Sequence, residues 1–490
     1  MGCLQIPFLN IFNKGPYKRQ KRNEKERIKL RYDVVIVGSG PAGIFAAIEL
    51  VKDQKKVLIV DKGKVIKDRR CPILEGRSSV CVNCDSCNIV SGWGGAGSAS
   101  DGKLTLTTGF GGNLEECIGE DALEELIRYV DDTFVHFGAD KKYYEPSGEI
   151  VKETIRKAAS KGIKIIPARI RHIGTDASRM VLNNMYEELK DKCDILMNTE
   201  VKEIVVRNGV AEGILLEDGR QIEADSVILA PGREGSSWLE GIVNRYNLSI
   251  ASMPVDIGVR VEVPDSICED LTRHFYEVKC LYNTPTFDDR CRTFCMNPSG
   301  FVVHEYNKAH DLVTVNGHSL KNVKSKNTNF AVLVTKNFTQ PFNNPIGYAT
   351  HIAKLANMLA GGGILVQRLG DLRDGRRSTE ARIARGMVHP TAKAQPGDLS
   401  LVLPHRFLTD IVEFIEALNI IMPGINMNDT LLYGVEIKLY SLRLELKSSL
   451  ETPAIRHLYM AGDGAGVSRG IIQAAASGVV AARSIIFENK

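Results

Sequence analysis

A glycine-rich turn near the start of the chain constrains its fold more than any other feature. Residues 33–37 form a run rich in Val and Ile that predicts a buried parallel strand, and Gly38, Gly40 and Gly43 follow in G-x-G-x-x-G spacing before an apolar helix. In such a turn the glycines allow a tight bend, close approach of a pyrophosphate and close helix packing. Asp61 ends the next predicted strand, where a carboxylate can hold ribose hydroxyls. The pattern predicts an ADP-containing dinucleotide at the helix N-terminus.

Length and composition set the broad class of protein. A chain of 490 residues exceeds a single hydrophobic core. We therefore expect about two to four domains. With 43% apolar and 25% charged residues, the composition is that of a globular protein. Polar residues interrupt the apolar stretch 470–487, so no transmembrane segment is expected.

Positive charge is concentrated in the first 31 residues. These residues carry a net charge of +7, and since the whole chain carries +4, residues 32–490 carry −3. A slightly acidic body argues against a specific nucleic-acid partner. We interpret residues 1–31 as a solvated basic arm, with attachment to an anionic membrane or RNA as the weaker alternative. The charges follow the apolar residues instead of preceding them, which excludes a secretory signal and predicts a cytoplasmic protein.

The pattern of elements divides the chain into three parts. Alternating strands and helices occupy residues 32–245, with a strand at 164–166 and an antiparallel hairpin at 201–217. Residues 246–452 lose that alternation and predict an antiparallel sheet with helices at 348–359 and 406–417. The first pattern returns at 453–490, where an Ala-rich helix follows a glycine loop. We therefore predict a discontinuous domain, 32–245 plus 453–490, interrupted by an inserted domain at 246–452.

Two further glycine segments decide between NAD and FAD. The strand end at 229–232 and the strand, loop and helix around Gly462 and Asp463 resemble the second and third signatures of the glutathione-reductase-like FAD flavoproteins. The resemblance implies that Asp463 binds the ribityl chain of FAD. Independently, the N-terminus of the helix at 471–487 offers free N–H groups and a positive dipole end, which would stabilise an anionic reduced flavin.

The resemblance defines the expected fold and cofactor site. The implied fold class is α/β, with a Rossmann-like FAD/NAD(P)-binding domain of glutathione-reductase type and an inserted α+β domain built on an antiparallel sheet. The residues expected to bind FAD are Gly38, Ser39, Gly40, Pro41, Ala42, Gly43, Asp61, Lys62, Gly95, Ala96, Gly97, Val201, Ala230, Gly232, Gly462, Asp463, Gly470, Ile471 and Ile472.

The inserted region extends the resemblance to a family of FAD-dependent dehydrogenases of unassigned substrate. The segments that carry it are 94–97 with 100–103, 295–300, 315–319, 390–391 with 396–398, and 462–466. Members join the flavin domain to an FAD-dependent-protein C-terminal domain. The similarity covers roughly residues 32–490 and implies fold and cofactor, but no particular reaction.

A cysteine-rich loop carries the expected metal ligands. Cys81, Cys84 and Cys87 follow C-x2-C-x2-C spacing, with Cys71 as a fourth thiol. Reduced thiols, structural zinc, a [4Fe-4S] cluster and a redox dithiol are all compatible with this pattern. A cluster so close to residues 94–97 would relay single electrons to the flavin.

The predicted catalytic residues lie in the inserted region. His318 and Lys438 are candidate proton donors beside the flavin, while either has an ordinary structural role as the alternative. An arginine-rich stretch at 368–385 that includes Arg377 predicts either an anion site for the substrate or exposed charges paired with Asp371, Asp374 and Glu380. No second nucleotide fold is recognisable, so NAD(P)H as electron donor is unsupported.

These features predict an FAD-dependent oxidoreductase that exchanges hydride between flavin and an unidentified small organic substrate, with an anionic substrate as one option. One alternative is an electron-transfer flavoprotein with an iron-sulfur relay and a ferredoxin-type partner. Another is a non-enzymatic FAD-binding protein.

Overall fold

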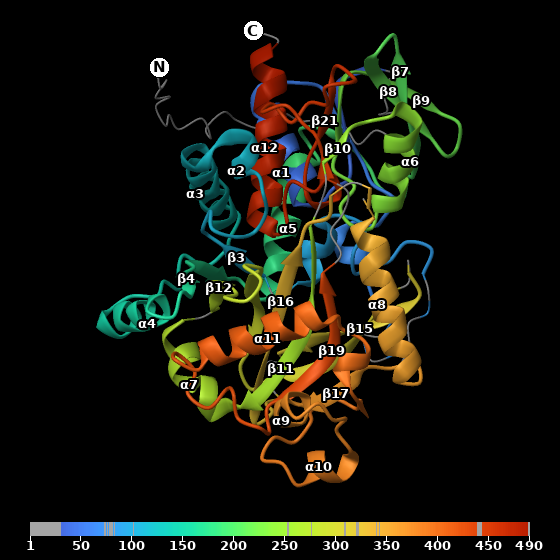
Figure 1. The fold of residues 1–490 in the computed structure, drawn as a ribbon. Helices are drawn as coiled ribbons and strands as arrows, with labels where there is room; N and C mark the ends of the chain where they lie inside the picture. The colour runs from blue at the N-terminus through green and yellow to red at the C-terminus, as the bar shows by residue number, and fades with distance from the viewer. Residues whose placement is uncertain are drawn as a thin grey trace.

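The chain builds two large sheets, one in the upper and one in the lower half of Figure 1. This computed structural model describes residues 31–488 except 73, 74, 76, 78–81, 83, 101, 252, 253, 276, 308, 309, 320–322, 340, 343 and 439–442. Residues 1–30 of the predicted basic arm and the predicted metal ligand Cys81 lie outside the described residues.

The first sheet has a Rossmann-like parallel core. Its strand order is β6-β2-β1-β9-β8-β7, and β21 also pairs with β9. The strands β6, β2, β1 and β9 run parallel, while β7 and β8 form the predicted antiparallel hairpin. The bounds are β1 Arg31–Val37, β2 Val57–Val60, β6 Asp194–Leu196, β7 Val201–Arg207, β8 Val210–Leu216, β9 Gln221–Leu229 and β21 Leu458–Met460.

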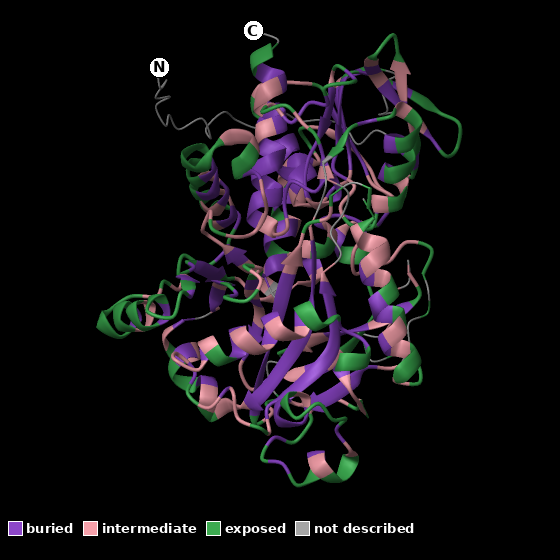
Figure 2. Cartoon of the chain, viewed as in Figure 1, coloured by how far each residue is buried: buried purple, intermediate pink, exposed green. Residues whose placement is uncertain are grey.

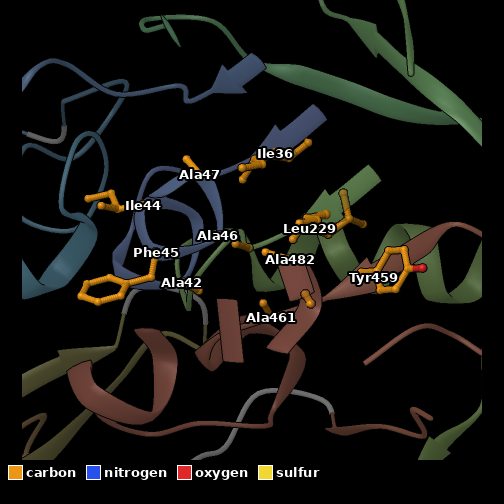
Figure 3. Packing of buried hydrophobic residues seen from close by; sticks show 14 of the residues in the cluster. Ile36, Ala42, Ile44, Phe45, Ala46, Ala47, Leu229, Tyr459, Ala461 and Ala482 are labelled. Atoms are coloured by element: carbon orange, nitrogen blue, oxygen red, sulfur yellow. The ribbon is translucent and has the colours of Figure 1, made fainter. Parts of the chain in front are cut away.

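Helices α1 and α12 pack against each other beside this sheet. A Cβ atom at Gly478 of α12 would lie 1.9 Å from the carbonyl oxygen of Ala42 in α1, so the two backbones touch. Figure 3 shows the alanines of both helices that pack with Ile36, Leu229 and Tyr459. The helices of this part are α1 Pro41–Lys52, α2 Glu115–Ile118, α3 Glu120–His136, α5 Thr175–Leu189, α6 Ser236–Tyr246 and α12 Ile471–Glu488, with short helices η2 Ile66–Asp68, η3 Gly95–Ala99 and η5 Asp463–Ala465.

The second sheet is mostly antiparallel, in the order β18-β17-β19-β11-β16-β13-β12-β4. Its strands are β4 Lys164–Ile166, β11 Val255–Pro264, β12 Lys279–Asn283, β13 Arg290–Asn297, β16 Asn327–Lys336, β17 Leu365–Arg368, β18 Gln395–Pro396 and β19 Leu431–Lys438. The helices of this part are α4 Glu149–Ala159, α7 Asp265–His274, α8 Pro345–Leu359, α9 Leu369–Arg373, α10 Glu380–Ala384 and α11 His405–Leu418, with η4 Leu399–Leu401. Two-stranded ribbons complete the fold: β3 Lys103–Thr105 with β5 Ile170–His172, β10 Ile250–Ala251 with β20 Arg443–Leu444, and β14 Phe301–Asn307 with β15 Leu312–His318.

The central strand β11 separates an apolar core from a buried polar face. Its residues alternate, as a strand with two different faces requires. Ile257 and Val259 join the apolar core under α8 and α11. Asp256, Arg260 and Glu262 alternate with them and are buried as well. Figure 2 shows this buried strand at the centre of the lower sheet.

One predicted strand belongs to the other sheet. The strand at 164–166 was expected within the first α/β pattern, but β4 pairs with β12, and Ile163 and Ile165 join the apolar core of the second sheet. A three-residue strand carries no signal that identifies its partner, because pairing depends on residues more than 100 positions away.

Helix α12 is long and apolar enough to cross a membrane, with a mean hydropathy of 1.4, but 61% of that stretch is buried in the fold. Its alanines contact α1 and the first sheet, as in the core helix of a globular protein.

We expect Gly478→Ala to lower the free energy of unfolding by about 1–3 kcal/mol, because the new methyl group would overlap a backbone oxygen of α1. Gly241→Ala is the matched control, since Gly241 lies in α6 with nothing within 4 Å of a new Cβ. The control should raise stability by about 0.5–1 kcal/mol through helix propensity. Urea unfolding of both variants measures the difference, and a stabilising Gly478→Ala would contradict the close packing.

Candidate functional site

The three glycines of the first turn have different surroundings. Gly38 has φ +103°, and its Cβ would lie 2.1 Å from the carbonyl oxygen of Ala230. A Cβ at Gly43 would lie 1.9 Å from the carbonyl oxygen of Gly38. At Gly40 nothing lies within 4 Å of a new Cβ, and φ is −72°. Protein packing therefore requires glycine at 38 and 43, whereas position 40 opens on a free space at the N-terminus of α1.

Segments that are far apart in the sequence meet at this turn. A Cβ at Gly95 would lie 3.1 Å from the Cα of Gly40, and one at Gly97 would lie 3.6 Å from Ile471 at the start of α12. Strand β21 pairs with β9, and a Cβ at Gly464 would lie 2.7 Å from the carbonyl oxygen of Gly232. The glycine segments 38–43, 94–97, 230–232 and 462–466 thus form one continuous region.

Asp61 is held by the protein itself. One carboxylate oxygen accepts hydrogen bonds from the backbone N–H and the hydroxyl of Ser39, at 2.8 and 2.7 Å. The other accepts from the N–H groups of Gly63 and Gly92, at 2.7 and 3.0 Å. A carboxylate offers about four lone-pair sites. These donors therefore occupy them, and the predicted ribose contact would have to replace one of them.

Two other predicted residues lie around Asp61. The backbone oxygen of Asp61 accepts a hydrogen bond from the N–H of Thr199, two residues before Val201 at the start of β7. Lys62 forms a 3.5 Å ion pair with Glu234, just beyond the 230–232 segment.

The N-terminus of α12 has backbone donors that the helix itself does not use. The N–H of Ala474 donates a hydrogen bond to the carbonyl oxygen of Gly470, which is the first backbone hydrogen bond of the helix. The N–H groups of the preceding residues therefore need acceptors outside the helix. Gln473 is 3% exposed, and its Nε2 has no hydrogen-bond partner among the described residues. A Cβ at Gly111 would lie 3.6 Å from that nitrogen. This donor set fits the acceptor edge of a flavin ring.

Asp463 lies in the turn before α12. Its carboxylate accepts a 2.7 Å hydrogen bond from Ser468 and lies 3.5 Å from Nε of Arg233. Burial raises the pKa of Asp463 above its usual value, against the opposing effect of Arg233 and Ser468. A carboxyl group offers oxygens that accept hydrogen bonds from sugar hydroxyls. With the open space at Gly40, these groups fit FAD.

The cysteine loop is tied to the glycine region by Arg69, which the sequence did not single out. The Arg69 guanidinium donates to the carbonyl oxygens of Asn88, Ile89 and Trp93. Its burial lowers its pKa to about 10. Of the predicted metal ligands, Cys84 is exposed and Cys71 and Cys87 are half-buried. In the part of the chain that the structure describes, which omits Cys81, no group of three or more ligand side chains could hold a metal ion.

The predicted catalytic residues fall into two places. Lys438 ends β19 and its Nζ lies 2.9 Å from a carboxylate oxygen of Glu436. His318 ends β15 with an exposed side chain, next to Gly317, whose Cβ would lie 2.1 Å from a guanidinium nitrogen of Arg260. Arg377 lies between α9 and α10, at the end of the molecule opposite α1 and α12 in Figure 1. The structure therefore brings His318 and Lys438 near one network and leaves Arg377 apart from it.

The arginine-rich stretch is mostly paired with acidic residues. Asp371 is fully buried and lies 2.9 Å from Arg376, 3.4 Å from Arg382 and 3.6 Å from Arg368. Arg373 pairs with Glu416, and Arg368 also pairs with Asp429. The paired interpretation holds for these arginines, with Glu416 and Asp429 as partners that the local sequence did not indicate. These ion pairs involve four of the arginines, and the anion site at Arg377 stays a prediction.

A buried ion pair on the polar face of the second sheet was missed from the sequence. Arg260 and Glu436 are both 0% exposed and form two hydrogen bonds of 2.8 and 2.9 Å. Arg260 also donates to the side-chain oxygens of Asn316 and Asn329 and to the carbonyl oxygen of Cys295. The segments 295–300 and 315–319, which carried the family resemblance, thus converge on Arg260. The sequence signal that could have indicated this ion pair is the alternation of charged and apolar residues in 255–264.

Comparisons with known proteins agree with this architecture. Residues 254–439 match the family model "FAD-dependent protein, C-terminal domain-like", residues 32–82 match "Pyridine nucleotide-disulphide oxidoreductase" and residues 397–488 match "Glucose inhibited division protein A". An uncharacterized protein of Clostridium beijerinckii is 29% identical over 481 residues, which cover 94% of this chain and 81% of that protein.

Two solved structures are remotely similar to the chain. Glycine oxidase from Geobacillus kaustophilus has a TM-score of 0.37 at 14% identity, with 93% of this chain and 95% of that chain covered. Formate oxidase from Aspergillus oryzae has a TM-score of 0.46 at 12% identity, with 94% and 98% covered. TM-scores below 0.5 do not establish a common fold.

The family models and the site together define the class: the protein is an FAD-dependent oxidoreductase, as the motifs predicted. Within that class, residues 254–439 of the second sheet and its helices are similar to the FAD-dependent-protein C-terminal domain, and the substrate is unassigned. This class favours the enzymatic interpretation over a non-enzymatic FAD-binding protein.

Replacing Glu436 by Gln should lower the free energy of unfolding at pH 7 by about 3–5 kcal/mol, because Arg260 would keep an uncompensated buried charge. Although burial alone would raise it, the charges of Arg260 and Lys438 hold the pKa of Glu436 below its usual value. The carboxylate therefore stabilises the fold above the unfolded pKa of about 4.3 and loses this effect as the pH falls through its lower folded pKa. Urea unfolding from pH 7 downward should show the gap between wild type and Glu436→Gln narrowing in acid. The exposed Glu240→Gln is the control, and an equal loss of stability in both variants would contradict the assignment.

Proposed function

We propose that this chain exchanges hydride between FAD and a small organic substrate, held where the two sheets meet. FAD, when bound, supplies a flavin ring that accepts or donates hydride. The observation that carries the proposal is the convergence of the four glycine segments with the N-terminus of α12, where Gln473 has an unpartnered buried donor.

The residues of the chain have distinct roles in this proposal. The open space at Gly40 accepts the pyrophosphate, since the N-terminus of α1 attracts an anion. Asp463 binds the sugar alcohols of the ribityl chain, as the family resemblance implies. The free N–H groups of α12 and the Gln473 amide donate to the flavin carbonyls and favour negative charge on the ring.

The domain assignment is part of the proposal. Residues 32–245 plus 453–490 form an FAD-binding domain of glutathione-reductase type. Residues 246–452 form the inserted domain with the substrate side of the site, except that Leu248 and Leu444 near its two ends join the core of the first part. The pairing of β9 with β21, which places the last part of the chain beside the first, supports this division. The segment from α4 to β4 is an exception to this division. In sequence it belongs to the first part of the chain, but in space β4 pairs with β12 of the second sheet.

His318 is the proposed proton donor or acceptor. Its side chain is exposed at the end of β15, and its neighbour Gly317 lies against the Arg260 network that ends in Lys438. An imidazole can move a proton near neutral pH, which an oxidation of an alcohol or amine requires in either direction.

A second candidate function is single-electron transfer through an iron-sulfur cluster at Cys71, Cys81, Cys84 and Cys87, with a ferredoxin-type partner. The contacts of Arg69 favour this candidate, because they tie the cysteine loop to Trp93, next to the 94–97 segment. Absence of iron and acid-labile sulfide from anaerobically purified protein would exclude it, and bound zinc would assign the loop a structural role.

Gly40→Val tests the proposed cofactor site. The side chain fits the protein, since nothing lies within 4 Å of the Cβ, but it fills the space proposed for the pyrophosphate. We expect FAD affinity to fall by more than about tenfold, with an unchanged unfolding midpoint for the apoprotein.

Gly241→Val is the matched control, because this exposed glycine also has free space around its Cβ but lies on α6, outside the glycine region. Flavin content is measured by absorbance after reconstitution with FAD. Normal flavin content in Gly40→Val would contradict the site, and anaerobic reduction of the wild-type flavin by small metabolites tests the activity.

A further inference from the structure

A cluster of cations around one aromatic ring lies between the two sheets. The Nζ of Lys279 lies 4.1 Å from the ring centre of Phe294, the guanidinium carbon of Arg292 lies 5.1 Å from it and the Nζ of Lys438 lies 5.6 Å from it. Lys279 also lies 5.2 Å from the ring centre of Phe110. Cations at such distances are attracted to the face of the ring, which holds them in place.

This cluster adjoins the proposed flavin side of the site. Phe110 comes directly before Gly111, whose carbonyl oxygen accepts the N–H of Arg469, two residues before α12. A Cβ at Gly111 would also lie 3.6 Å from the unpartnered amide nitrogen of Gln473. A ligand that contacts Phe110 and Phe294 would therefore lie close to the N-terminus of α12.

Among the described residues, the ion pairs of the cluster join more cations than carboxylates. Lys279 pairs with Glu277, Arg292 pairs with Asp256, and Glu436 neutralises Arg260. Lys438 also contacts Glu436, which leaves four cations and three carboxylates in this group. A surplus of one charge matches a monoanion such as a carboxylate better than a phosphate, which carries nearly two charges at neutral pH.

The cluster has accessible ends and a buried interior. The side chains of Arg292 and Lys438 are 20% and 17% exposed, whereas those of Lys279 and Glu436 are 7% and 0% exposed. Phe110 and Phe294 are half-buried and offer an apolar surface beside these cations. Arg292 and Lys438 are therefore the groups that a ligand can reach.

We propose that Arg292 and Lys438, backed by Lys279 and Phe294, bind the carboxylate of an organic acid that is the substrate. This inference rests on the proposed function, and it deepens that function by naming the substrate class. It also changes the role expected for Lys438 from proton donor to anion ligand. Guanidinium and ammonium groups bind carboxylates through charge-assisted hydrogen bonds.

The test uses the full-length protein loaded with FAD, with benzoate and acetate as probes and their neutral isosteres benzamide and acetamide as controls. Isothermal titration calorimetry measures affinity, and the flavin absorption spectrum reports whether a bound probe lies beside the ring. We expect a carboxylate probe to bind at least about tenfold more tightly than its amide and to shift the flavin spectrum. Inorganic phosphate should bind more weakly than the carboxylate.

Lys438→Met should raise the dissociation constant of the carboxylate probe by about tenfold or more, and Lys438→Arg should restore most of the affinity. Lys354→Met is the control, because Lys354 is an exposed lysine on α8 of the same sheet layer. The unfolding midpoint and the FAD content of each variant identify any general damage to the fold. If Lys438→Met is destabilised, Lys438→Arg still tests the site because it keeps the positive charge.

Several results would overturn the inference: no binding of either carboxylate, equal binding of acids and amides, preference for phosphate, or unchanged affinity in Lys438→Met. Carboxylate binding without a spectral shift would also overturn it, because the site would then lie away from the flavin. If the protein fails to bind FAD, the proposed function is contradicted but the anion site is not. Calorimetry with the carboxylate probes still measures binding at the anion site in that case.

Discussion

The contact between α1 and α12 is the constraint on which the rest of the site depends. Gly478 lets the backbones of the two helices touch, so the last helix of the chain lies beside the first. Because of this contact, the N-terminus of α12 adjoins Gly97, and the turn at 462–466 meets the loop at 230–232. A larger residue at 478 would separate the helices and with them the two halves of the proposed cofactor site.

Much of the first sheet could be predicted from sequence because its signals are local. The glycine spacing at 38–43, the run of Val and Ile before it and the Ala-rich helix at the end each indicate their structure without reference to distant residues. The predicted hairpin after residue 200 is confirmed for the same reason, as β7 and β8 are neighbours in the chain. The partner of β4 was not predictable, because it lies far along the sequence.

The buried polar face of the second sheet shows where sequence reasoning stopped. The charges at 256, 260 and 262 interrupt an apolar strand, which indicates two different faces, but their partners come from separate strands and from a hairpin. For Asp61, the ligand role inferred from its position competes with four protein donors that only the fold reveals. In the arginine-rich stretch, by contrast, the sequence suggested a ligand site, but the fold pairs these arginines mainly with Asp371, Glu416 and Asp429.

Helix α4 and strand β4 come before the inserted region in sequence, but β4 belongs to the second sheet. This arrangement has a mechanical consequence for the two layers, which are the two sheets with the helices packed on them. Along the described chain, the backbone passes between the layers at four places: after α3, between β4 and β5, between β10 and β11, and between β19 and β20. A simple insertion would be joined by two connections, which can act together as a hinge. A layer that is joined by four connections is more restricted in such a motion than a layer joined by two. A ligand would then reach the space between the layers through rearrangement of side chains and loops at its rim, with little change in the angle between the sheets.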